Sequence, residues 1–131
     1  MTGPSGYPPI IRRYWYSIDW EVTDLWTLDL PVRTLPIDRL LWHLDVPVWP
    51  DAEGNPYCVT PREVMSDPVL HEGEHKRVMV ADTSFPLEVI DREGRLMILD
   101  GIHRLTRLWS DGAGTVDIRL VPPDAVRWIL P

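Results

Sequence analysis

The feature that most constrains this chain is an abrupt change of hydrophobic period at Asp100-Gly101. Before it, the short β-prone runs Leu87–Ile90 and Arg95–Leu99 flank Asp91–Gly94, whose residues favour a turn. After it, apolar side chains recur at helical spacing as far as Gly112, a residue type that commonly ends helices in a left-handed conformation. The sequence therefore predicts strand, turn and strand, and then a helix that begins at a glycine corner.

The predicted corner has the chemistry of an anion-binding site. Gly101 allows the backbone to approach a ligand closely, and the first N–H groups of a helix have no partner inside it. The helix dipole adds attraction for negative charge at the same end. His103 brings a ring that exchanges protons near neutral pH, and Arg104 brings a planar cation suited to phosphate. The predicted phosphate-binding residues are Gly101, Ile102, His103 and Arg104, and His103 is also a candidate general acid or base.

Each of these residues also has a purely structural interpretation. Asp100 can belong to the catalytic group, or it can cap the helix and occupy the amides assigned to phosphate. His103 can instead be bonded into the core, and Arg104 can form a surface ion pair. Four more candidates lie at the expected rim of the site. Asp82, Thr83 and Ser84 can instead form a turn between a helix and a strand. Arg107 can extend the anion site or simply be solvated on the helix.

The run Asp100-Gly101-Ile102-His103-Arg104, with Leu105 behind it, resembles the DG-x-HR signature of the ParB/sulfiredoxin superfamily. The resemblance extends over Pro86 to Val121, where strand, motif, helix and following strand occur in the superfamily's order. In that superfamily the signature opens a helix whose N-terminus binds nucleotide phosphates. The resemblance implies an α+β fold with a small mixed, partly barrel-like sheet and packed helices. It also implies Mg²⁺ bound together with a nucleotide.

The same resemblance assigns a catalytic base to the upstream segment. Val32–Leu35 corresponds to the superfamily's first core strand, and Thr34–Asp45 to the segment leading toward the active site. In the free-serine kinases of the superfamily an acidic residue of that segment acts as base, so Asp45 is the first candidate and Asp38 the second. Sulfiredoxins carry Cys immediately before the His-Arg pair, and Ile102 occupies that place here, so their chemistry is excluded.

Further helix and strand signals surround the motif. Thr60-Pro61-Arg62-Glu63 is a helix start in which Thr60 and Glu63 can form a capping box, and this helix should end by Asp67-Pro68. We also expect a helix, or an irregular turn followed by a helix, at His71–Ala81, a helix at Asp124–Leu130, and a strand at Thr115–Val121.

The N-terminal half is rich in aromatic residues, since five of the seven Trp residues occur by Trp49. Ile10–Val22 is particularly dense in Trp and Tyr. An extended segment that covers the core is the favoured interpretation. A platform that binds a protein partner or stacks on a base is the alternative, because Trp and Tyr are common interface anchors.

A second motif competes with the corner. His71-Glu72-Gly73-Glu74-His75 satisfies H-E-x-x-H, in which two His one helical turn apart bind zinc and the Glu activates a water molecule. Pro68 lies just upstream, so the motif would fall in the first turn of a helix, and Gly73 weakens that helix. Zinc bound by His71 and His75 is therefore the less favoured interpretation, and a solvated, charged helix start is preferred.

Composition narrows the class of protein. With 131 residues the chain has the size of one domain, and we expect a loose arm at residues 1–9 followed by a single domain at residues 10–131. The net charge of −7 counts against nucleic acid as the main partner, because nonspecific binding depends on Lys and Arg. The single Cys58 fits a reducing cytoplasm, and no apolar stretch approaches membrane-spanning length. We expect a cytoplasmic protein without a membrane partner.

These observations give four hypotheses for function. The first is a nucleotide- or phosphate-binding, ParB-like enzyme, most concretely a kinase-like transferase that moves a phosphoryl group from a nucleotide to a small hydroxyl acceptor, with Asp45 taking the proton. The second is a noncatalytic module that senses a nucleotide or phosphosugar and contacts a protein through its Trp-rich half. A nuclease or DNA-associated protein is third, and a zinc peptidase is fourth.

Overall fold

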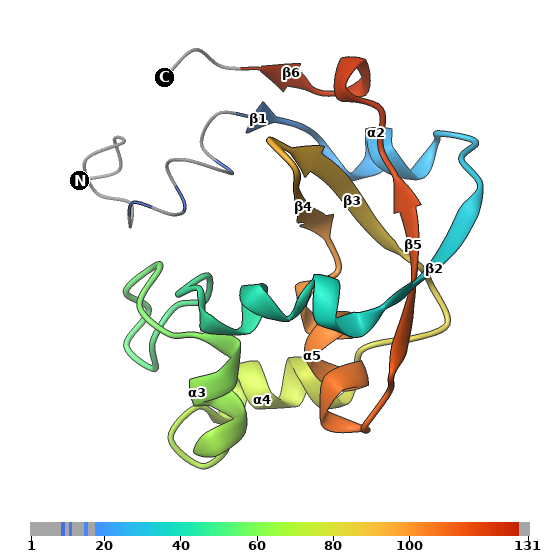
Figure 1. The fold of residues 1–131 in the computed structure, drawn as a ribbon. Helices are drawn as coiled ribbons and strands as arrows, with labels where there is room; N and C mark the ends of the chain where they lie inside the picture. Colours follow the sequence, from blue (N-terminus) through green and yellow to red (C-terminus); the bar gives the residue numbers. More distant parts are fainter. Residues whose placement is uncertain (1–8, 10, 12–14, 16–17, 129–131) are drawn as a thin grey trace.

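The computed structural model describes residues 9, 11, 15 and 18–128, so the predicted arm lies outside the described residues apart from Pro9. Figure 1 shows the hairpin of β3 and β4 between α3, α4 and α5 on one side and α2 with the paired strands β1 and β6 on the other. The elements in chain order are β1 (Ile18–Asp19), α2 (Val22–Trp26), β2 (Val32–Pro36), the 3-10 helices η2 (Ile37–Arg39) and η3 (Leu41–Asp45), α3 (Pro61–Ser66), α4 (Glu72–Met79), β3 (Leu87–Arg92), β4 (Arg95–Asp100), α5 (Ile102–Ser110), β5 (Thr115–Leu120), the 3-10 helix η4 (Pro123–Ala125) and β6 (Arg127–Trp128).

The main sheet is mixed and has the strand order β2-β5-β3-β4. β3 pairs with β4 in an antiparallel hairpin and with β5 in parallel, and β5 pairs with β2 in an antiparallel ladder. This confirms the α+β class. The described strands form no closed barrel, because β2 and β4 remain at opposite edges of the main sheet and β1 pairs separately with β6.

Side chains, rather than another strand, occupy the edge of β4. The indole N–H of Trp15 donates to the carbonyl of Ile98 at 2.8 Å, and that of Trp42 donates to the carbonyl of Leu96 at 3.0 Å. The N–H of Ile98 donates to Nε2 of the buried His43 at 2.9 Å. These bonds satisfy edge groups that would otherwise accept a further strand, which gives a physical reason for the open sheet. Within the predicted aromatic segment Ile10–Val22, Trp15 and Trp20 pack against a hydrophobic core cluster, as the core-covering interpretation expects, while residues 10, 12–14, 16 and 17 lie outside the described residues.

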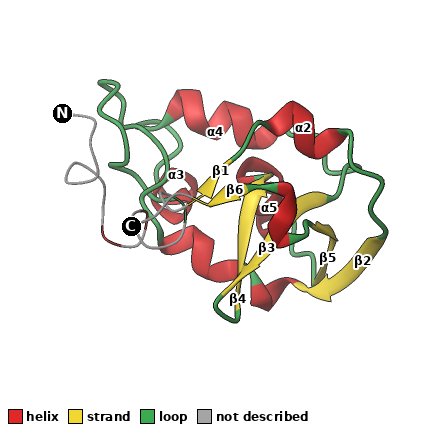
Figure 2. Ribbon diagram, turned by 90° about the horizontal axis from the view of Figure 1, so that it is seen from above, coloured by secondary structure: helices red, strands yellow, loops and turns green. Residues whose placement is uncertain are grey.

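Both faces of the hairpin are buried, because alternate residues enter different hydrophobic clusters. Leu96 and Ile98 join the cluster that includes Leu105 of α5, and Met97 and Leu99 join the cluster beneath β1 and β6. Figure 2 shows α5 beside β3, and the two elements are in contact. The start of α5 is therefore fixed against the centre of the sheet. Within the described residues, the helices are too short and too polar to cross a lipid bilayer.

Local signals predicted most element boundaries. The capping box is present at the start of α3, since the N–H of Glu63 donates to Thr60 Oγ1 and the N–H of Thr60 donates to Glu63 Oε1, both at 3.0 Å. The predicted terminal helix is wrong where the structure describes it, because η4 is followed by β6. There Arg127 pairs with Asp19 of β1 and donates to its carboxylate at 2.9 Å, so strand pairing overrides local helix propensity.

Candidate functional site

The glycine corner is present and requires glycine. Gly101 is the N-cap of α5 with φ 120° and ψ 20°, a left-handed conformation that side chains disfavour. A Cβ atom on Gly101 would lie 2.8 Å from Cγ of Leu87, so the position also lacks space. Within the described part of the chain, no side chain forms a capping hydrogen bond at this helix start. The first-turn amides therefore remain without a side-chain acceptor, as an anion site requires.

Asp100 does not act as the cap that the sequence allowed. Its Oδ2 accepts hydrogen bonds from Nε1 of Trp26 at 3.1 Å and from Nη2 of Arg104 at 3.0 Å. Arg104 also donates through Nη1 to the carbonyl of Pro86 at 2.7 Å. The ion-pair interpretation of Arg104 is thus confirmed, although Asp100 and Arg104 keep part of their side chains exposed.

A cavity of about 440 Å³ opens beside the corner. It brings together five residues predicted for the site and its rim, Asp82, Asp100, Gly101, His103 and Arg104, and adds Arg77 and Phe85 among others. The helix start consequently faces a concavity with cationic and acidic side chains around it.

His103 is held by two residues that the sequence did not indicate. Its Nε2–H donates to Oε2 of Glu74 at 2.9 Å, and its ring stacks on Trp49 with 4.5 Å between ring centroids and 14° between planes. About a third of the side chain, 33%, stays exposed. A carboxylate that fixes one ring nitrogen orients the imidazole and leaves Nδ1 as its second proton-exchange position.

The predicted rim is only partly at the cavity. Asp82 lines it, while its Oδ1 accepts from the N–H and the hydroxyl of Ser84 at 3.0 and 2.6 Å, and these bonds lower the pKa of the Asp82 carboxyl. The turn interpretation is therefore confirmed for Asp82 and Ser84, and neither Thr83 nor Ser84 is among the residues of the cavity wall. Arg107 donates to Asp111 at 2.9 Å and to the carbonyl of Met79, and it lies outside the cavity wall.

Asp45, the base assigned by resemblance, forms an ion pair with Arg62 away from the cavity beside α5. Its carboxylate accepts from Nε and Nη2 of Arg62 at 2.8 and 3.3 Å, its side chain is 63% exposed, and it does not line the cavity beside α5. Asp38, the second candidate, is exposed in η2 and does not line that cavity either.

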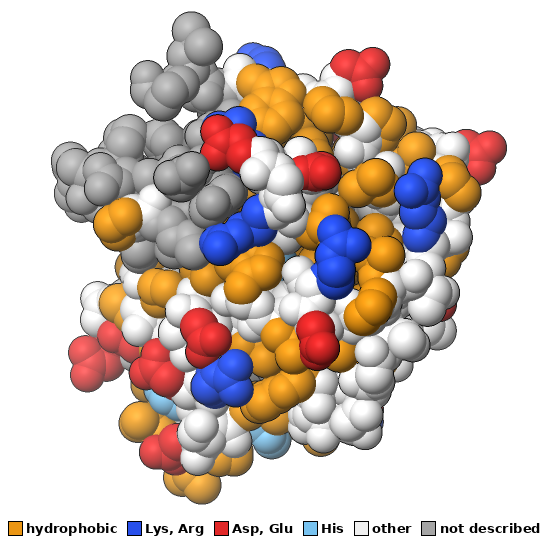
Figure 3. Space-filling model, viewed as in Figure 1, with side chains coloured by type: hydrophobic (Ala, Val, Ile, Leu, Met, Phe, Trp, Pro, Cys, Tyr) orange, Lys and Arg blue, Asp and Glu red, His pale blue; other side chains and the backbone are white. Residues whose placement is uncertain are grey.

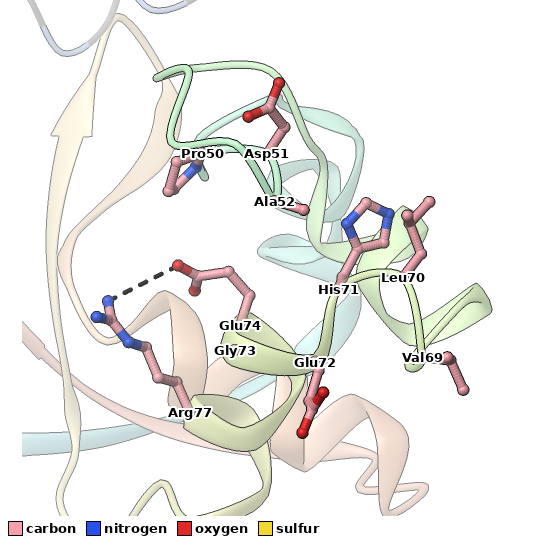
Figure 4. A pocket seen from close by; sticks show the side chains of 10 residues that line it. All are labelled: Pro50, Asp51, Ala52, Val69, Leu70, His71, Glu72, Gly73, Glu74 and Arg77. Carbon is pink, nitrogen blue, oxygen red and sulfur yellow. Dashed lines mark ion pairs between the residues drawn. The ribbon is translucent and has the colours of Figure 1, made fainter.

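The H-E-x-x-H segment lines a separate cavity of about 360 Å³ (Figure 4). His71 is the N-cap of α4 rather than a helical residue, and Figure 4 shows His71 and Glu72 pointing to different sides of the helix start. Glu74 turns instead toward Arg77, whose Nη1 is 3.7 Å from its Oε1. Across the described part of the chain, no three His, Cys, Asp or Glu side chains are grouped as metal ligands.

The residues that sequence reasoning missed come from distant segments. Glu74 is 29 residues from His103, and Trp49 belongs to the loop before α3, so no local spacing connects them to the corner. Comparison of the chain with protein-family models, curated proteins and solved structures finds no match. What the arrangement can do chemically is to bind an anion at α5 and exchange a proton at His103.

Proposed function

We propose that this chain binds a nucleotide or another phosphorylated small molecule at the start of α5 and transfers a phosphoryl group to a small hydroxyl acceptor. The observation that carries this proposal is the first turn of α5, which has no side-chain cap and opens at Gly101 into the cavity with His103. A phosphate placed there would accept hydrogen bonds from the amides of Ile102 and His103 and interact favourably with the helix dipole. The DG-x-HR resemblance supports the same placement.

Arg77 is the guanidinium best able to meet the phosphate. Arg104 already donates to Asp100 and to the carbonyl of Pro86, whereas Arg77 is 71% exposed and lies 3.7 Å from its ion-pair partner Glu74. Arginine binds phosphate through paired N–H groups, so Arg77 would add charge and orientation at the mouth of the cavity.

His103 replaces Asp45 as the proposed base, because Asp45 is held by Arg62 outside the cavity. The acceptor oxygen would bond to phosphorus while the bond from phosphorus to the bridging oxygen breaks. The hydroxyl proton would pass to Nδ1 of His103, and the leaving group would depart as the shortened nucleotide. Such transfer depends mainly on positioning and charge stabilisation, which a few groups at one helix end can supply.

Mg²⁺ fits the acidic side of the same cavity. Carboxylate oxygens are the protein ligands that Mg²⁺ prefers, and Asp82 presents one carboxylate there while Asp100 is occupied by Trp26 and Arg104. Asp82 would hold the ion, which when bound neutralises phosphate charge.

The surface charge is unlike that of a nucleic-acid-binding protein. The Lys and Arg side chains on the face drawn in Figure 3 are scattered among apolar and acidic ones, in keeping with the net charge of −7. A small phosphorylated ligand needs only local charge, which the corner provides.

Isothermal titration calorimetry with nucleoside di- and triphosphates and Mg²⁺ tests the proposal, followed by a phosphoryl-transfer assay with small alcohols. Arg77→Glu should weaken nucleotide binding by about tenfold or more, since a charged hydrogen bond is lost. Lys76→Glu is the matched control, because Lys76 is exposed on the same helix but lines neither cavity at α4. Binding without transfer would identify a noncatalytic nucleotide sensor, and equal binding by both variants would refute the phosphate site.

A further inference from the structure

A second cavity adjoins the phosphate cavity. It has a volume of about 490 Å³, which is within the range of small-molecule sites. Phe85 and Arg104 line both cavities, so one ligand can extend from the start of α5 into the second space. The remaining walls are Trp26, Pro86, Glu88 and Arg119.

The two aromatic residues of this cavity are unusually exposed for their size. Trp26 is 59% exposed and Phe85 is 61% exposed, although large apolar side chains normally gain from burial. Trp26 is nevertheless fixed, because its Nε1 donates to the same Oδ2 of Asp100 that accepts from Arg104. An anchored indole beside a cavity is suited to stack on a planar ring, and base–aromatic stacking is a general means of binding nucleotides.

The wall of the cavity includes a buried carboxyl group, one oxygen of which has no hydrogen-bond partner among the described residues. Glu88 lies in β3 and is 3% exposed, and its Oε2 accepts no hydrogen bond. It forms an ion pair with Arg119, whose Nε lies 3.5 Å from Oε2 and makes no hydrogen bond to the described residues. Nη2 of Arg119 donates to the carbonyls of Leu25 and Leu28. Buried polar groups are seldom left unsatisfied, because the lost hydration costs free energy. Burial also raises the pKa of the Glu88 carboxyl, and Arg119 opposes this in part.

We infer that this second cavity binds the base of the nucleotide, with the ring against Trp26 and Phe85 and with N–H groups of the base donating to Glu88. This inference depends on the proposed function, because the phosphate would occupy the adjoining cavity. Guanine is the base that fits best. Its Watson–Crick edge presents two adjacent N–H donors to a carboxylate, whereas uracil places carbonyl oxygens on both sides of its single N–H. The ligand class is therefore a guanine nucleotide.

Calorimetric titration of the full chain with GDP, IDP, UDP and pyrophosphate in the presence of Mg²⁺ tests the base site. The base of inosine keeps the ring N–H of guanine and lacks its exocyclic amino group, so the difference in affinity between GDP and IDP measures the contribution of that amino group. We expect GDP to bind about tenfold more tightly than IDP, and more tightly still than UDP or pyrophosphate. Glu88→Gln should remove most of the preference for GDP and leave pyrophosphate binding unchanged.

Trp26→Ala provides a second variant that does not alter the buried carboxyl. It should weaken all three nucleotides by about tenfold and leave pyrophosphate unaffected, since stacking is lost. The control is Trp128→Ala, because Trp128 is partly exposed in β6 and lines neither cavity. Thermal melting of each unliganded variant shows whether its fold is retained.

The outcomes separate this inference from the proposed function. If GDP binds no better than pyrophosphate and Arg77→Glu weakens both, the base site is refuted and the phosphate site stands. If GDP binds through Glu88 and Trp26 while Arg77→Glu has no effect, the base site stands and the proposed function is refuted. Absence of binding by all four probes refutes the guanine site, and the titration with other nucleoside di- and triphosphates then decides the phosphate site.

Discussion

Oε2 of Glu74 lies 2.9 Å from Nε2 of His103 and connects α4 to the first turn of α5. The imidazole of His103 is also held by Trp49, because the indole stacks on it. Glu74 is only 12% exposed, so solvent screens this pair incompletely. The imidazole is therefore held at the cavity wall in one orientation, which a general base requires.

Glu74→Gln should lower the rate of phosphoryl transfer while nucleotide affinity changes little. A neutral amide no longer stabilises the protonated ring, so we expect kcat to fall by about tenfold to a hundredfold, which is at or below the low end of the effect of losing a general base itself. Steady-state kinetics and calorimetry on the same preparation measure the two quantities. Glu72→Gln, exposed on the same helix and outside the cavity beside α5, should leave both unchanged. An unaltered kcat in Glu74→Gln would contradict the proposed role of this pair.

The glycine corner could be predicted from the sequence because all of its determinants are local. The change of period at Asp100-Gly101 and the turn residues before β4 are fixed by neighbours within a few positions. The orientation of His103 could not be predicted, since Glu74 and Trp49 reach it only through the packing of α4 and of the loop before α3. Contacts between segments so far apart in the sequence cannot be predicted from local residue spacing.

The positions of the Trp side chains in the N-terminal half could also be predicted only in part. Aromatic density indicated a covering role, and the hydrogen bonds from Trp15 and Trp42 to β4 account for it. Sequence alone could not show that these indoles would occupy the edge of the sheet and leave it open. Nor could it single out Trp26, which is exposed and donates a hydrogen bond to Asp100 beside the second cavity.

His43 should make the stability of the protein depend on pH. Its Nε2 accepts from the N–H of Ile98, so Nδ1 carries the proton that bonds the carbonyl of Leu40 at 2.7 Å. Burial lowers the pKa of His43 from 6.5 to about 4. The unfolded chain therefore binds more protons between these values, and the free energy of unfolding should fall by about 3 kcal/mol as pH drops from 6.5 to 4.

Urea denaturation at a series of pH values measures this dependence. His43→Gln should flatten the profile between pH 6.5 and 4, whatever its absolute stability, because the titrating ring is gone. His75→Gln is the control, since it removes a partly buried histidine and leaves the His43 ring in place. An identical slope in His43→Gln would assign the dependence to other groups.

Gly101→Ala should destabilise the fold more than a glycine substitution in an open turn. The new Cβ would combine an unfavourable φ of 120° with a contact of 2.8 Å to Leu87 Cγ. We expect a loss of about 2–4 kcal/mol, from backbone strain and displacement of a core side chain together. Gly94→Ala is the matched control, because Gly94 has φ +83° but nothing within 4 Å of the added atom. Thermal denaturation that ranks the two variants equally would show that the corner tolerates a side chain.

Thr60→Ala should weaken the start of α3 and, through it, the support of His103. The substitution removes Oγ1, the acceptor for the N–H of Glu63, and keeps the reciprocal bond, whose donor is the backbone N–H of residue 60. A lost N-cap costs about 1 kcal/mol. Val64 of α3 packs in one cluster with Trp49, so the loosening should also raise amide hydrogen exchange around the indole that stacks on His103. Ser66→Ala is the control at the other end of the helix, where the hydroxyl only bonds back to the carbonyl of Arg62, and it should change stability by less than about 0.5 kcal/mol. If Thr60→Ala matched Ser66→Ala in denaturant midpoint and exchange, the capping box would contribute nothing to the site.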